Sequence, residues 1–416
     1  MNYPEPSSGK KSGTSYKITI KMERLDNPRL MEPLLPPDGT KVLEDLAVEL
    51  VSATAGLAGK LSEDTVQAVS SLVRSMNCYY SNLIEGHQTH PVDIERALKG
   101  DYSSEPRKRD LQLEAFAHIE VQRIIDSRAL RAIEVPRAEF IMTLHKEFCS
   151  RLPAELLKSR DPKSGKEVVV VPGEFRCNEV LIGAHLAPVA SELANFMRLF
   201  ESRYQVASLS RVMQIVAVAA SHHRLLWIHP FLDGNGRVAR LFSHAFLKGL
   251  GVGNALWSVS RGLARNVSEY KARLADADSW REGDTDGRGS LTQRGLIEFC
   301  KFFLAVCVDQ VRFMEQLLEP AGLLDRVRRY CADQMERKEL PKGAFEVLRE
   351  VILFGPLPRA RVGDVTGYKE RQARSVVAAL LENELLISES PRSPLQLHIP
   401  HKVVSAWFPR LYPGEL

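Results

Sequence analysis

The segment His229–Arg240, with the sequence HPFLDGNGRVAR, restricts the fold and function of this chain more than any other. Apolar helical patterns precede and follow it, which predicts a short loop between two helices. The imidazole of His229 has an ordinary pKa near neutral, which suits a general base. The carboxylate of Asp233 is a ligand that suits Mg²⁺. The start of the segment therefore offers a proton acceptor and a metal ligand.

The rest of the segment is suited to binding an anion. Gly234 and Gly236 lack Cβ atoms, so the backbone N–H groups around Asn235 can turn toward a phosphate. Arg237 and Arg240 share one face of the helix that begins here, and the helix N-terminus adds partial positive charge. The alternative is a helix-capping turn beside a core histidine, but a cap needs neither the second arginine nor an asparagine between glycines. We predict a nucleotide site with a general base beside it.

This segment resembles the signature of the Fic family, H-P-F-x-D-G-N-G-R-x-x-R, and matches every specified position. The resemblance implies a protein adenylyltransferase, which moves AMP from ATP to a Ser, Thr or Tyr hydroxyl of a target protein or of itself. It implies His229 as the base and Asp233 as the ligand of Mg²⁺. It also implies that ATP is bound by the polar positions of the segment, which are Asp233, Gly234, Asn235, Gly236, Arg237 and Arg240.

A helix is predicted upstream, at about 62–86. Ser62 is a good N-cap, the apolar periodicity continues to Tyr80, and Gly86 is a plausible C-cap. Glu85 then lies at the negative end of the helix. This breaks a local rule and suggests that a cation from elsewhere compensates.

Ser81, Glu85 and Gly86 resemble the inhibitory motif of Fic proteins, (S/T)-x-x-x-E-(G/N). The resemblance implies that Glu85 pairs with Arg240 and blocks the position of the γ-phosphate, so that the enzyme is autoinhibited. Movement of this helix, for example in a homodimer, would release the inhibition. Relatives with this glutamate can also remove AMP. The alternative is a solvated surface glutamate.

The segment 165–183 is predicted to form a small hairpin. Residues 165–171 and 180–183 are strand-like, and Pro172-Gly173 is a turn. The segment resembles the flap of Fic proteins, which pairs with an extended piece of the target by strand addition. A structural hairpin over the core is the alternative. On the resemblance, the target-docking positions are Val171, Gly173, Phe175 and Arg176.

The C-terminal part of the chain, 325–416, has a different pattern. Three helical stretches are followed by two strands, which resembles a winged helix. DNA binding is one possibility and docking of a protein is another. The residues that would face DNA are Lys369, Arg371, Gln372 and Arg374 on the third helix and Arg392 on the wing.

Composition adds a few limits. The net charge of +4 is too small to argue for a nucleic acid or a membrane partner. The six cysteines form no C-x-x-C pair, which favours a reducing cytoplasm, and no apolar run reaches membrane-spanning length. His222 and His223 could belong to a metal site, but no carboxylate or cysteine has ligand spacing.

We therefore expect a mainly α fold and an autoinhibited adenylyltransferase in the cytoplasm, with ATP and a hydroxyl-bearing protein as partners. The alternative is a transcriptional regulator that senses nucleotide and binds DNA, although sensing ATP requires no base such as His229. The expected regions are a flexible arm (1–38), a helical region with the inhibitory helix (39–135), a Fic core with its flap and motif loop (136–318), and an α+β winged helix (325–416).

Overall fold

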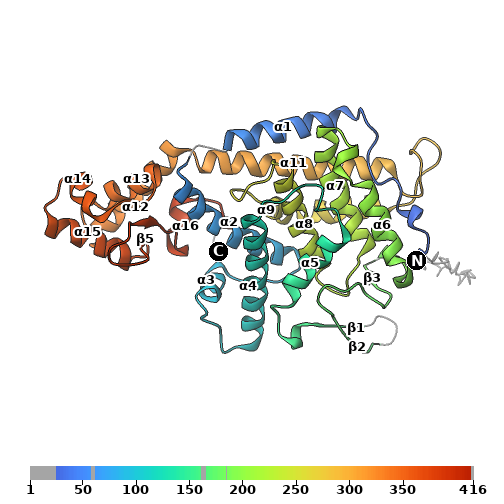
Figure 1. The fold of residues 1–416 in the computed structure, drawn as a ribbon, viewed down its shortest axis with the longest axis horizontal. Coiled ribbons are helices and arrows are strands. Elements are labelled where there is room, and N and C mark those ends of the chain that lie inside the picture. Colours follow the sequence, from blue (N-terminus) through green and yellow to red (C-terminus); the bar gives the residue numbers. More distant parts are fainter. Residues whose placement is uncertain (1–24, 58–60, 161–164, 184, 414–416) are drawn as a thin grey trace, which may run out of the picture.

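The computed structural model describes residues 25–57, 61–160, 165–183 and 185–413, and it is mainly helical, as predicted (Figure 1). At its centre, α7 (Arg211–Ile228) packs against α8 (Asn235–Gly249). The sequence of α7 is apolar on nearly all sides, so only an internal position buries it. The two central helices therefore hold the loop between them, 229–234, against the core.

The other helices surround this pair or extend the fold to either side. α1, α6, α10 and α11 pack against α7, and α4, α5 and α9 pack against α8. Their bounds are α1 (Lys41–Leu57), α2 (Glu63–Ile84), α3 (Pro91–Leu98), α4 (Pro106–Ser127), α5 (Ala138–Cys149), α6 (Leu193–Arg203), α9 (Val259–Arg265), α10 (Val267–Asp278) and α11 (Gln293–Leu317), with short 3₁₀ helices at η1 (Pro28–Met31), η2 (Ala154–Leu156), η3 (Ala190–Glu192) and η4 (Val206–Ser208).

The described part of the predicted arm belongs to the core. Leu25, Met31 and Leu34 are buried, and the Tyr204 hydroxyl donates to the carbonyl of Leu34 at 2.6 Å. The prediction of a flexible arm is therefore wrong for residues 25–38, because their apolar side chains fill space beside α6 and α7. The predicted strand at 16–21 lies outside the described residues.

The upstream helix occurs as predicted. The side chain of Ser62 caps the N-terminus of α2 by accepting from the Thr65 N–H at 3.3 Å. At the other end Gly86 adopts φ +84°, a left-handed conformation that glycine tolerates. α2 lies beside α4 and α9, and it ends close to the start of α8.

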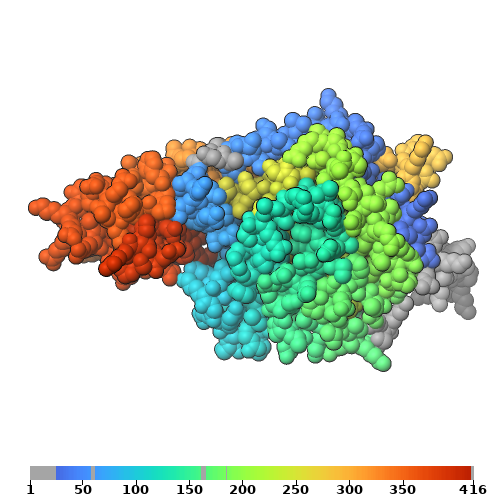
Figure 2. Space-filling model, viewed as in Figure 1, coloured from blue at the N-terminus to red at the C-terminus, as the bar shows by residue number. Residues whose placement is uncertain are grey.

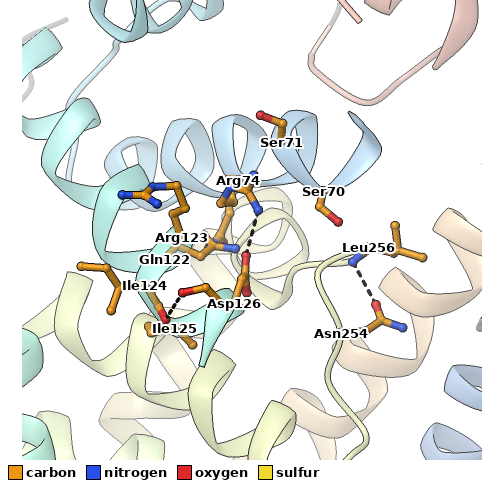
Figure 3. A network of polar contacts seen from close by, with 12 residues as sticks. Ser70, Ser71, Arg74, Gln122, Arg123, Ile124, Ile125, Asp126, Asn254 and Leu256 are labelled. Carbon is orange, nitrogen blue, oxygen red and sulfur yellow. Dashed lines mark hydrogen bonds and ion pairs between the residues drawn. The ribbon is translucent and has the colours of Figure 1, made fainter. Parts of the chain in front are cut away.

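Asp126, at the end of α4, ties three helices together. Arg74 of α2 donates to one carboxylate oxygen at 3.3 Å (Figure 3), and Nε2 of His244, on α8, lies 2.7 Å from the other. Nearby, Asn254 accepts a hydrogen bond from the Leu256 N–H at 2.9 Å. α2 is thus fixed to α8, the helix that carries Arg237 and Arg240.

The predicted hairpin is paired differently in the structure. β1 (Lys158–Arg160) pairs with β2 (Glu167–Val169), and β3 (Leu181–Ile182) pairs with β4 (His185–Leu186), so strands 165–171 and 180–183 do not pair with each other. The reason is that the chain turns into the core after β2, where Val170 is buried. The prediction of a single hairpin across 165–183 is therefore wrong.

The C-terminal residues form a separate lobe at the left of Figures 1 and 2. The predicted helices and strands all occur, and α12 and α16 are additions that were not predicted. α12 packs against α13 and α16, so the lobe begins near residue 320, ahead of the predicted boundary at 325. Its identity as a winged helix stays a prediction. Its elements are α12 (Pro320–Glu336), α13 (Ala344–Phe354), η5 (Arg359–Arg361), α14 (Val362–Thr366), α15 (Glu370–Glu382), β5 (Leu386–Ile387), β6 (Gln396–Leu397) and α16 (His401–Trp407).

The lobe contacts α2 directly. The Thr65 hydroxyl donates to the Ile352 carbonyl at 2.9 Å, and the Leu397 N–H donates to Asp64 at 3.2 Å. Further along the same helix, the Tyr80 hydroxyl donates to the carbonyl of Leu411 at 3.0 Å. The lobe therefore holds α2 from its first turn to the turn before Glu85.

Two simple expectations can be checked at this level. All six cysteines are free, as predicted. Among the described residues, no helix combines the length and the apolar character needed to cross a membrane.

Candidate active site

His229 occupies the junction between α7 and the motif loop. It ends α7 in the left-handed conformation, with φ 51° and ψ 61°, which is uncommon for a residue that has a Cβ. Gly234 also has a positive φ, 80°, and α8 begins at the next residue. The predicted loop between two helices is confirmed, and two left-handed residues bend it.

Arg176 stabilises the junction at His229 by hydrogen bonds to nearby backbone carbonyls. Its Nε donates to the carbonyl of His229 at 2.8 Å and its Nη2 to that of Pro188 at 2.6 Å, while its backbone N–H donates to the carbonyl of Pro230 at 2.9 Å. A cation is favourable here because the C-terminus of α7 carries partial negative charge. Burial lowers the pKa of Arg176 to about 10, so the guanidinium remains charged at neutral pH. Arg176 therefore fixes the backbone of His229.

Asn235 braces the loop from inside. Its side-chain oxygen accepts from the Phe231 N–H at 3.0 Å, and its Nδ2 donates to the Phe231 carbonyl at 2.8 Å. Since the side chain is buried and uses both polar atoms, it shapes the loop instead of reaching a phosphate. The predicted place of Asn235 beside the phosphates stays a prediction.

His145, on α5, was not predicted as a site residue. Its ring stacks on Phe231 with the centroids 3.9 Å apart, and its Nδ1 accepts from the Gly173 N–H at 2.8 Å. It thereby connects the turn after β2 to the motif loop. The sequence offers no signal for this contact, because a lone histidine on an apolar helix face is ordinary.

Asp233 lies at the open side of the loop. Its side chain is 52% exposed, and its Oδ1 accepts hydrogen bonds from the Gly234 N–H at 2.5 Å and from Arg237 Nη2 at 3.3 Å. This carboxylate is accessible from solvent and sits at the N-terminus of α8. It is the exposed charge of a loop whose other residues are buried or partly buried.

Arg240 contacts Glu85 and Ser81, two of the residues that resemble the inhibitory motif. Its Nη2 lies 2.6 Å from Glu85 Oε1, and its Nε donates to the Ser81 hydroxyl at 2.8 Å. A Cβ on Gly236 would overlap the Glu85 carboxylate, so this carboxylate lies directly over the glycine turn. Burial raises the pKa of Glu85, but the charge and the hydrogen bond of Arg240 outweigh burial and hold that pKa below its usual value. The predicted pair between Glu85 and Arg240 is confirmed.

Arg237 is paired with a carboxylate that the sequence analysis missed. Its Nη1 lies 2.8 Å from Glu114 Oε1, and its guanidinium carbon lies 5.0 Å from the centre of the Phe148 ring. Glu114 comes from α4. The available signal was its place on the buried side of α4, in line with Ala117 and Val121, where an unpaired carboxylate would be costly.

The imidazole of His229 is neutral at physiological pH. Burial, helped by the nearby charge of Arg176, lowers the pKa of His229 from its ordinary value to about 4. The ring can therefore accept a proton at pH 7. The chemistry that this arrangement permits is proton removal beside an anion-binding helix terminus.

Comparison with known proteins agrees with this geometry. Residues 135–247 match the model of the Fic/DOC family, and this range contains α5, α6, α7, the whole motif loop and most of α8. These residues form a Fic domain. The helices α2 and α4, which supply the carboxylates on the two arginines, lie outside the matched range.

Among curated proteins, the chain is similar to "Protein adenylyltransferase Fic" of Drosophila erecta, 28% identical over 169 residues, which is 41% of this chain and 31% of the relative. It is 27% identical to the protein of the same name from Drosophila virilis over 41% of this chain and 32% of that relative. The chain thus spans about a third of the length of these relatives. A solved structure of a Fic family protein from Desulfovibrio desulfuricans G20 has 17% identity and a TM-score of 0.51, covering 88% of this chain and 98% of that one, and indicates a shared fold.

In the Fic domain, the predicted docking residues divide into two groups. Val171 is 45% exposed and Phe175 is partly buried beside Phe231, whereas Gly173 and Arg176 are buried. Gly173 donates to His145 and Arg176 to His229, so both support the site from within. The docking role is therefore wrong for Arg176, and for Val171 and Phe175 it stays a prediction.

The histidine pair before the Fic motif is structural. His222 lies between the Ser243 hydroxyl at 2.8 Å and the Tyr270 hydroxyl at 2.7 Å, and His223 Nε2 lies 3.1 Å from Asp278. Both rings are buried. Within the described ranges no group of three His, Cys, Asp or Glu side chains could hold a metal ion, so the alternative of a His-cluster metal site finds no support there.

Replacing Arg176 by Met should lower the free energy of unfolding by roughly 2–4 kcal/mol, because the carbonyls of His229, Asn178, Pro188 and Ile228 lose a charged donor. The free energy of unfolding of Arg176→Lys should lie between those of wild type and Arg176→Met, since lysine keeps the charge but not the planar guanidinium. Denaturant unfolding of each variant measures the effect. Arg198→Met, at an exposed arginine of α6, is the matched control and should change stability by less than about 0.5 kcal/mol. Wild-type stability of Arg176→Met would contradict the bracing role.

Proposed function

We propose that this chain is a protein adenylyltransferase that transfers AMP from ATP to a Ser, Thr or Tyr hydroxyl of a target protein or of itself. The observation that carries the proposal is the placement of a neutral, partly buried His229 at the end of α7, in the loop that leads into α8, whose first turns present Arg237 and Arg240. A site that only bound nucleotide would need no such base. The printed names of the curated relatives support the same activity.

The proposed nucleotide site is the N-terminus of α8. Its positive end, the backbone around Gly234 and Gly236, and the two arginines would bind the phosphates of ATP. Asp233 would hold Mg²⁺, and its exposed carboxylate fits that role because Mg²⁺ is usually bound by one or two carboxylates together with substrate phosphates. Mg²⁺ would supply positive charge against the phosphates.

In the proposed reaction, the oxygen of the target hydroxyl attacks the α-phosphorus of ATP. A bond forms between this oxygen and phosphorus, the bond to the β-phosphate bridge breaks, and pyrophosphate leaves. His229 accepts the proton of the hydroxyl. Positive charge from Arg237, Arg240 and the helix N-terminus stabilises the phosphates as the bonds change.

The proposal includes autoinhibition by Glu85. Its carboxylate lies over Gly236 and on Arg240, so it would compete with the γ-phosphate for the arginine and repel it. ATP would then bind in a pose that does not react. The reverse reaction, removal of AMP with this carboxylate positioning water, is part of the proposal, and release of Glu85 in a homodimer stays a prediction.

Labelled ATP tests the function. Wild type, Glu85→Gly and the double variant Glu85→Gly/His229→Ala are incubated with Mg²⁺ and ATP labelled at the α- or the γ-phosphate, with a cell lysate as a source of targets. We expect α-label on protein with Glu85→Gly, little with wild type and none with the double variant. Label from the γ-phosphate would instead indicate a kinase, and no label in any sample would contradict the proposal.

A nucleotide-sensing regulator remains the second candidate because of the C-terminal lobe. The side chains predicted to face DNA are exposed, although Arg374 forms an ion pair with Glu370. Selective, salt-sensitive DNA binding that changes with ATP in a gel-shift assay would favour this candidate. The exposed residues are Lys369, Arg371, Gln372, Arg374 and Arg392.

A further inference from the structure

The contact between Glu114 and Arg237 differs in kind from the contact between Glu85 and Arg240. Glu85 lies over the glycine turn, where the phosphates are proposed to bind. Glu114 approaches from α4 and binds only Nη1 of Arg237, at 2.8 Å. The Nη2 of the same arginine points to Asp233, at 3.3 Å. Glu114 therefore holds one edge of the guanidinium while another edge faces the carboxylate proposed to bind Mg²⁺.

Glu114 is itself fixed on its other side. Its Oε2 lies 2.7 Å from Nδ1 of His87, in the segment that follows Gly86. Burial raises the pKa of Glu114, but the hydrogen bond from His87 and the charge of Arg237 outweigh burial and keep that pKa below its usual value. The carboxylate thus stays ionised and joins the end of α2, α4 and α8.

Arg237 is also held by packing. Its side chain is 5% exposed, and its guanidinium lies over the Phe148 ring. Its Nε has no hydrogen-bond partner among the residues that the structure describes, so the guanidinium retains donor capacity. A buried arginine that is held at one edge and unsaturated at another is prepared for an anionic ligand, because little side-chain freedom is lost on binding.

We propose that Glu114 is a positioning residue of the Fic site, which fixes the guanidinium of Arg237 so that it binds the β- or γ-phosphate of ATP. This inference rests on the proposed function, since it assumes that ATP binds at the start of α8. The inference predicts the direction in which Glu114 changes ATP affinity. A positioning carboxylate strengthens ATP binding, whereas an inhibitory one, as proposed for Glu85, weakens it.

Binding measurements without turnover test this proposal. In the background Glu85→Gly/His229→Ala, titration calorimetry with Mg²⁺ compares ATP and AMP before and after Glu114→Gln, an isosteric change. We expect ATP affinity to fall about tenfold, as for the loss of one well-placed charge-assisted hydrogen bond. AMP affinity should stay unchanged, because AMP has no β- or γ-phosphate. Glu120→Gln, at a carboxylate of α4 that binds the surface residue Arg123, is the matched control and should change neither.

Two outcomes would overturn the proposal. Higher ATP affinity in Glu114→Gln would make Glu114 a second inhibitory carboxylate. An equal loss of affinity for ATP and AMP would reduce the role of Glu114 to holding the fold.

If Glu114→Gln does not fold, His87→Ala replaces it, since the His87 side chain is 39% exposed and only the second contact of Glu114 is lost. The ATP affinity of His87→Ala should fall about threefold, and its AMP affinity should stay unchanged. Because no AMP transfer is measured, failure of the proposed reaction would leave this result interpretable.

Discussion

The variant Glu85→Gly should transfer AMP roughly 10 to 100 times faster than wild type, because one charge-assisted hydrogen bond of about 1.5–3 kcal/mol no longer competes for Arg240. In the structure this bond is 2.6 Å long, and Arg240 is 2% exposed, so the γ-phosphate has no second route to that guanidinium. Removing the carboxylate also removes a negative charge from the position over Gly236. The initial rate of α-label incorporation at saturating Mg²⁺ and ATP measures the gain.

Three variants separate this explanation from a general loosening of α2. Glu85→Gln keeps the shape and a weaker hydrogen bond, so its rate should lie between those of wild type and Glu85→Gly. Glu85→Gly/Arg240→Met should lose most of the gain, since the freed arginine is then missing. The third variant, Ser75→Gly, weakens α2 at a partly exposed position and should leave the rate unchanged. Equal rates for wild type and Glu85→Gly would reject autoinhibition by this residue.

The contact at Glu85 could be predicted from the sequence, and the contact at Glu114 could not. Ser81, Glu85 and Gly86 form a short pattern at a helix end, where a negative charge is unfavourable and therefore conspicuous. Glu114 lies in the middle of α4 and has no neighbouring pattern. Its partner Arg237 is 123 residues away, and only the packing of α4 on α8 brings them together.

The flap region shows a different limit of sequence reasoning. β-propensity and the Pro172-Gly173 turn indicated strands correctly, but strand pairing depends on what each side chain meets in space. Arg176 was predicted as a docking residue because its segment resembles the flap of Fic proteins. In the structure, carbonyls at the end of α7 and the carbonyl of Pro188 supply the acceptors that make its burial favourable.

The position of the C-terminal lobe was also beyond the sequence. Its elements follow from periodicity, but nothing in the pattern indicates that the Tyr80 hydroxyl donates to Leu411, or that the Tyr80 and Tyr412 rings stack 6.5 Å apart. Tyr80 immediately precedes Ser81, which accepts from Arg240. Any movement of the lobe that pulls on Tyr80 must therefore act on the turn that carries the inhibitory motif.

Replacing His229 by Ala should lower the rate of AMP transfer in the Glu85→Gly background by about 10²- to 10⁴-fold, the usual contribution of a general base. The pH dependence should follow from the lowered pKa of about 4. Only the neutral ring accepts a proton, so activity should persist below pH 6.5 and fall as the pH approaches 4. A histidine with an ordinary pKa would lose activity near pH 6.5. Initial rates from pH 4.5 to 8 distinguish the two cases.

The controls must separate loss of the base from loss of structure. ATP affinity of His229→Ala should match that of its parent, because the phosphates are proposed to bind α8 and the arginines rather than the imidazole. His90→Ala removes an exposed histidine whose side chain caps nothing, and it should change neither the rate nor its pH dependence. Tryptophan fluorescence shows over which pH range the fold persists. If His229→Ala keeps more than about a tenth of the parent rate, or if the rate of the parent falls near pH 6.5 while the protein stays folded, His229 is not the base that its burial indicates.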